Sequence, residues 1–99
     1  MAEKTCVKVL VEENGEQGFD SYRVPGIVTA SNGDLLLTYE GREVGGNRRT
    51  LFFRRYQIKD GQPQPAGERI TMVSPKGEEL LHNPLLIAAP EGRVYFFWC

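Results

Sequence analysis

Helical periodicity, clustered cysteines and long apolar runs are all missing from this 99-residue chain. No segment places apolar residues at a sustained helical period, which argues against a helical protein. Cys6 and Cys99 stand at opposite ends, so they suggest neither a metal site nor a disulfide framework. Residues 1–8 lack the apolar centre of a signal peptide, and no stretch is long enough to span a membrane. As written, we expect a cytoplasmic chain with no membrane span.

An excess of charge of either sign is also missing. Twelve basic and 13 acidic side chains give a formal net charge of −1, so no overall field favours nucleic acid or an anionic membrane. The pairs Arg48-Arg49 and Arg54-Arg55 are too short and too far apart to form a polybasic patch. No cluster of His, Cys and Asp ligands and no phosphate-binding glycine loop occurs, so we expect no metal and no organic cofactor.

Short β-rich runs, separated by glycine, proline and asparagine, make up most of the chain. The strongest single signal is Asn32-Gly33 between two apolar runs, which predicts a β-hairpin. We expect loops at residues 12–18 and 40–49 and a connection at residues 60–67. We expect strands at residues 7–11, 22–30, 35–39, 50–58, 68–73, 84–89 and 93–98. The sequence therefore predicts an all-β fold built from antiparallel hairpins.

The second hairpin repeats the first at an offset of 59 residues without a gap. Three identities fall at this offset: Pro25 with Pro84, Ala30 with Ala89, and Gly33 with Gly92. Repeats of this length, each made of a few short strands, have the size of a propeller blade. A small β-sandwich with two similar hairpins is the alternative.

Four elements in order resemble the start of the sialidase (neuraminidase) family. They are Tyr-Arg-Val-Pro at residues 22–25, Leu-Leu-Leu-Thr-Tyr-Glu-Gly-Arg at 35–42, the arginine pair at 54–55, and Asn-Pro at 83–84. The resemblance covers residues 19–99. It implies that residues 1–99 are a partial six-bladed β-propeller domain, with a first blade at about 19–73 and the start of the next at about 83–99.

The same resemblance implies a substrate-binding role for Arg23, Arg42 and Asn83. Arg23 matches the first arginine of a triad that holds the carboxylate of sialic acid, and Arg42 matches an arginine near the substrate. The chemistry agrees, because a guanidinium offers a planar, permanently charged fork to a carboxylate. The alternative for Arg23 is a surface arginine or one paired with Asp20.

The catalytic loop departs from the family pattern. Residues 43–49 contain no aspartate, and Asn47 stands about where the catalytic acid/base is expected. Glu43 is the one carboxylate in the loop. It is either a substitute acid or a solvated side chain. Sialidases use a tyrosine nucleophile, and no tyrosine here can be assigned that role. His82 is expected to be a loop residue.

These residues predict a fragment of an exo-sialidase-like glycoside hydrolase that acts on terminal sialic acids and is inactive alone. The alternatives are a non-catalytic sialic acid or glycan-binding propeller and a small β interaction domain. The expected partners are glycans that contain sialic acid, and unpaired blade faces such as residues 94–98 are expected to favour self-association.

Overall fold

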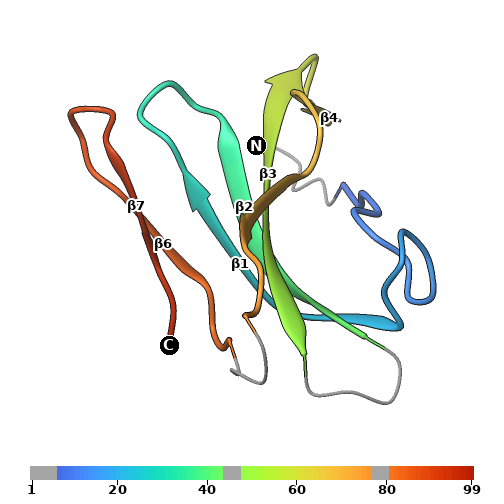
Figure 1. Ribbon diagram of the computed structural model, residues 1–99. Coiled ribbons are helices and arrows are strands. Elements are labelled where there is room, and N and C mark those ends of the chain that lie inside the picture. Colours follow the sequence, from blue (N-terminus) through green and yellow to red (C-terminus); the bar gives the residue numbers. More distant parts are fainter. Residues whose placement is uncertain (1–6, 44–47, 77–80) are drawn as a thin grey trace.

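The computed structural model describes residues 7–43, 48–76 and 81–99, and all of their regular structure is β-strand. Figure 1 shows a larger sheet and a separate hairpin beside it. The strands are β1 (Ser21–Thr29), β2 (Leu35–Arg42), β3 (Arg49–Lys59), β4 (Gln62–Pro65), β5 (Ile70–Val73), β6 (Leu85–Ala88) and β7 (Val94–Phe97). All pairs are antiparallel, so the expected all-β fold is confirmed.

The larger sheet is a meander in the order β1-β2-β3-β4, with β5 also paired to β3. Its centre is the β2–β3 pair, where Tyr39 lies opposite Phe52 and Glu40 lies opposite Leu51. Leu51 and Phe52 are almost completely buried. The core therefore forms around the large apolar side chains in the middle of β3.

Both hairpins turn in the same way. In the first, Ala30 N donates to Asp34 O (2.8 Å) and Gly33 N donates to Ala30 O (2.9 Å). In the second, the equivalent bonds of Ala89 and Gly92 measure 2.8 and 3.0 Å. Each glycine has a positive φ, 93° and 100°, as the last residue of a three-residue loop requires. The predicted hairpins are confirmed, and the repeat extends to backbone hydrogen bonds.

Three details of the sequence prediction are wrong. Residues 7–11 are not a strand, and residues 62–65, expected to be part of a connection, form β4. Residues 40–42, expected to be a loop because of Gly41, continue β2. There a Cβ on Gly41 would lie 2.6 Å from the Phe52 ring and 2.9 Å from the Phe19 ring, so the glycine provides space rather than a turn.

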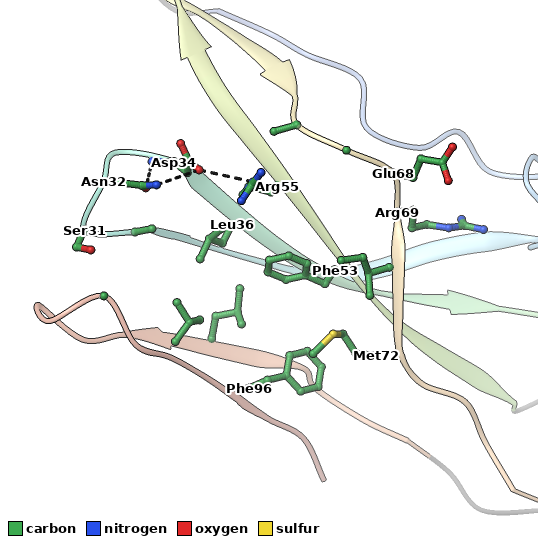
Figure 2. Close-up of a pocket in the computed structure, with 17 residues that line it drawn as sticks. Ser31, Asn32, Asp34, Leu36, Phe53, Arg55, Glu68, Arg69, Met72 and Phe96 are labelled. Atoms are coloured by element: carbon green, nitrogen blue, oxygen red, sulfur yellow. Dashed lines mark hydrogen bonds and ion pairs between the residues drawn. The ribbon is translucent and has the colours of Figure 1, made fainter.

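The hairpin β6–β7 lies against β1 and β2 of the larger sheet (Figure 1). Thr38 donates its hydroxyl proton to Pro84 O across this junction (3.4 Å). Beside it lies an open groove of about 900 Å³. Figure 2 shows Leu36, Phe53 and Met72 on the side of the sheet and Phe96 on the side of the hairpin. The strands form two sheets, β1–β5 and β6–β7, and the division of the chain into a first blade and the start of a second stays a prediction.

Candidate functional site

The structure places Arg42 and the backbone of Asn83 on one buried carboxylate, Glu40, and it places Arg23 opposite Glu40 in the neighbouring strand. Arg23 of β1 is the cross-strand partner of Glu40 in β2. Arg42 forms an ion pair with Glu40 at 3.1 Å, and the backbone N–H of Asn83 donates to Glu40 Oε2 at 3.0 Å. Three segments that are far apart in the sequence therefore meet at Glu40.

The environment of Glu40 is that of a structural anchor. The residue is 1% exposed, and its Oε1 accepts bonds from Arg42 Nε (3.3 Å) and Nη2 (3.1 Å). A buried carboxylate is costly unless it is paired and hydrogen-bonded, and both of its oxygens are used here. Glu40 therefore positions Arg42 and the backbone at Asn83.

Two further residues complete this group, and sequence reasoning assigned neither to it. Arg49, at the start of β3, pairs with Arg42 across the strands and lies 3.8 Å from Glu40 Oε1 through its Nε. Its Nη1 also contacts His82 Nδ1, so His82 is a half-buried partner as well as a loop residue. The sequence feature that could have predicted the place of Arg49 is the cross-strand register, because Arg42 and Arg49 lie on either side of a short β2–β3 connection. We call Arg23, Glu40, Arg42, Arg49, His82 and Asn83 the Glu40 cluster.

A β-bulge sets the position of Arg23. Residues 24 and 25 together oppose the single residue Tyr39, because the register passes from Arg23↔Glu40 to Gly26↔Thr38. Val24 has a φ of 56°, which is unusual for a β-branched residue. In a regular strand Arg23 would share a face with Ile27, and the extra residue breaks that alternation. Pro25 lies inside this bulge, where its missing N–H disturbs no regular ladder.

The Glu40 cluster has an excess of positive charge. Arg42 and Arg49 form ion pairs with one buried carboxylate, and Arg23, its cross-strand neighbour, is exposed with no ion pair to any described residue. In particular, no described contact joins Arg23 to Asp20, whose backbone N–H donates to Arg42 O (2.9 Å). Arg49 Nε is buried without a hydrogen-bond acceptor among the described residues. The arrangement therefore suits an added anion.

The β2–β3 connection, where a catalytic acid/base is expected, is described only in part. Asn47 lies outside the described residues. Glu43 lies just after β2, where its carboxylate is half exposed and 3.9 Å from Arg48 Nε. The side chain of Glu43 is therefore solvated.

Tyr39 is the most buried tyrosine near a carboxylate, and its surroundings favour the neutral phenol. It donates to Glu12 Oε2 (2.7 Å) and accepts from Arg54 Nε (3.0 Å). Burial, followed by the hydrogen bond to Glu12, raises the pKa of Tyr39 well above its ordinary value. A nucleophilic tyrosine needs the opposite shift, so Tyr39 serves packing and hydrogen bonding.

The groove between the sheet and the β6–β7 hairpin shares no lining residue with the Glu40 cluster. Its polar groups come from the first turn and β3, where Arg55 lies 3.6 Å from Asp34 and Asn32 Nδ2 donates to the same carboxylate, and from Glu68 and Arg69 (Figure 2). The described residues contain no group of three or more potential metal ligands and no helix that could cross a membrane. The groove thus has charged side chains in its lining but none of the site residues expected from the sequence, and the candidate site is the Glu40 cluster.

Comparisons with known proteins give one short match. A 32-residue stretch is 47% identical to a protein named sialidase from Micromonospora viridifaciens, and it covers 32% of this chain and 5% of that protein. No family model and no solved structure matches the chain. The match supports a sialidase-like relationship over about a third of the sequence.

Proposed function

We propose that the chain is part of a sialidase-like protein that binds the terminal sialic acid of glycoconjugates, with Arg23 as a ligand of the sugar carboxylate. The observation that carries the proposal is the gathering of Arg23, Arg42 and Asn83 at Glu40. Arg42 and Arg49 are already oriented by Glu40, whereas Arg23 is exposed and has no ion pair to a described residue. Of the three arginines in the Glu40 cluster, Arg23 is therefore the one best placed to bind a carboxylate from solution.

In this proposal the 99-residue chain does not hydrolyse sialosides by itself. Tyr39 stays neutral, and Glu43 is half exposed to solvent. A positively charged, oxocarbenium-like transition state needs several groups held in place at once. A propeller with further blades would supply the remaining arginines and the nucleophile.

Binding of free sialic acid to the chain, followed by NMR shifts, tests the carboxylate role. Arg23→Ala should weaken binding by about 1.5–3 kcal/mol, the value of a charge-assisted hydrogen bond, or roughly ten-fold to a hundred-fold. Arg93→Ala is the matched control, because Arg93 is an exposed arginine at the tip of the other hairpin. Unchanged affinity in Arg23→Ala would exclude the assignment.

A non-catalytic glycan-binding protein is the second candidate, and the exposure of Glu43 favours it. A fluorogenic sialoside distinguishes the two functions when it is offered to a longer protein that contains this chain. Turnover supports the hydrolase, and binding without turnover supports the glycan-binding protein. If the chain binds no sialic acid at all, the remaining candidate is a β interaction domain.

A further inference from the structure

A second buried carboxylate, Glu12, lies apart from the Glu40 cluster and is held by a ring of donors. Its side chain is 6% exposed. Arg69 Nη1 donates to Oε2 at 2.8 Å, and the Tyr39 hydroxyl donates to the same oxygen at 2.7 Å. Arg54 Nη2 donates to Oε1 at 3.4 Å. Tyr39, Arg54 and Arg69 therefore converge on a single carboxylate, and we call these three residues the Arg54/Arg69 cradle.

Contacts other than those to Glu12 also hold the cradle in place. The Arg69 guanidinium lies 4.0 Å from the centre of the Phe52 ring and donates to the Tyr22 hydroxyl (3.1 Å). Arg54 donates to Tyr39 from the neighbouring strand. These contacts orient the donors before a carboxylate arrives, which is the property of a binding site.

The cradle carries more positive charge than Glu12 neutralises. Arg54 and Arg69 are both one-fifth exposed, and Glu12 is the only carboxylate among the described residues that forms an ion pair with either. A buried, two-arginine site is strongly unfavourable when empty, so it selects a carboxylate ligand from whichever molecule offers one.

The segment that delivers Glu12 has few other attachments. Residues 7–12 form no strand and pair with no described strand. Their large apolar side chains gain little from burial, because Val7 and Val9 are about 40% exposed and Leu10 is 75% exposed. Glu12 therefore supplies most of the directional contacts that keep residues 7–12 on the sheet.

A pocket of about 190 Å³ adjoins the cradle, and its walls come partly from the same segment. Residues 9–12 form one side, and Tyr22, Arg23, Pro25, Leu37 and Tyr39 form the other. The opposite wall therefore offers the apolar side chains of Pro25 and Leu37 beside Arg23. A ligand that replaces residues 7–12 would place a carboxylate in the cradle and an apolar stem against Pro25 and Leu37.

We propose that Tyr39, Arg54 and Arg69 form a carboxylate-binding site, which Glu12 fills as an intramolecular ligand. When residues 7–12 leave the sheet, the site takes a carboxylate with an apolar stem from another molecule. An extended acidic peptide fits these requirements best, because residues 7–12 occupy the site in that form. None of the three donors belongs to the Glu40 cluster, although Arg23 of that cluster lines the adjoining pocket.

A blocked peptide with the sequence of residues 7–12 is the probe, with the same peptide carrying Gln in place of Glu as its control. Calorimetry should show at least ten-fold tighter binding to the Glu12→Ala chain than to wild type, because the internal competitor is gone. Adding Arg69→Ala to that chain should abolish the gain. Glu13→Ala removes an adjacent exposed carboxylate and should bind as wild type does.

Butyrate, a small carboxylate with an apolar stem, is the second probe and distinguishes a small acid from a peptide as the source of the bound carboxylate. Binding of the peptide alone supports an acidic peptide as ligand, and binding of both probes extends the site to small acids. Equal peptide binding by Glu12→Ala and Glu13→Ala, or equal binding of the Glu and Gln peptides, overturns the proposal.

Should Glu12→Ala fail to fold, the wild-type chain provides an independent measurement. Excess peptide should change the NMR chemical shifts of residues 9–11, because it displaces them from the sheet. Unchanged chemical shifts at saturating peptide would also overturn the proposal. Arg69 is a cradle donor outside the Glu40 cluster, so Arg69→Ala should weaken peptide binding and leave sialic acid binding unchanged, and the two proposals fail independently in that variant.

Discussion

Replacing Glu40 by Gln removes one charge from the Glu40 cluster while keeping the size of the side chain. Breaking a buried ion pair by removing one partner costs about 3–5 kcal/mol. The side chains of Arg42 and Arg49 are 26% and 16% exposed to solvent, so water partly compensates for the lost charge. In addition, the new amide NH₂ must face a donor, either Arg42 or the N–H of Asn83. We expect a loss of about 2–3 kcal/mol.

Urea and thermal unfolding, followed by far-UV circular dichroism, measure this loss. For a domain of this size it corresponds to a fall in melting temperature of roughly 10 °C or more. Glu43→Gln is the matched control, because Glu43 lies three residues away, is half exposed and forms a 3.9 Å ion pair. That variant should lose less than about 1 kcal/mol. Equal stability of the two variants would refute the view that Glu40 anchors the cluster.

Three further predictions concern other parts of the fold. Gly41→Ala should destabilise the chain by about 1–3 kcal/mol in urea unfolding, because its methyl group would meet the Phe52 ring; wild-type stability would show that the ring moves aside. Since the folded pKa of Tyr39 lies above its ordinary value of about 10, the neutral phenol adds stability that is complete below pH 10 and falls as the pH rises further. Tyr39→Phe should therefore flatten the decline in unfolding midpoint above pH 10, and an unchanged slope would contradict this. Phe97→Asp should reduce concentration-dependent association in sedimentation, because Phe97 and Ile87 are half exposed on the outer face of the β6–β7 hairpin; a wild-type chain that is monomeric at all concentrations would refute it.

The hairpins could be predicted from the sequence because their turns are local. Gly33 and Gly92 each need a positive φ, and the apolar runs on both sides then pair in only one register. Arg23 and Arg42 could be selected from the motifs that contain them. Local chemistry was therefore sufficient for the turns, whereas the substrate-binding roles of Arg23 and Arg42, which rest on the motif resemblance, stay predictions.

The remaining features depend on contacts between distant residues. Gly41 was read as a loop signal, whereas the nearby Phe19 and Phe52 rings explain why it has no side chain. Residues 7–11 alternate as a strand would, yet their position is set by Glu12, whose partner Arg69 is 57 residues away. The role of Glu40 emerges only when β2, β3 and residue 83 are brought together. No local pattern contains this information.

The backbone conformation of Val24 affects what a selection for thermal stability would enrich. A β-branched residue at a φ of 56° stores strain of about 1–3 kcal/mol, so Gly at this position would be favoured in a library screened for heat resistance. The same change would loosen the backbone that carries Arg23. If Arg23 binds sialic acid as proposed, screening for heat resistance alone would enrich variants in which that binding is weakened, and a screen that also scores sialic acid binding would retain Val24.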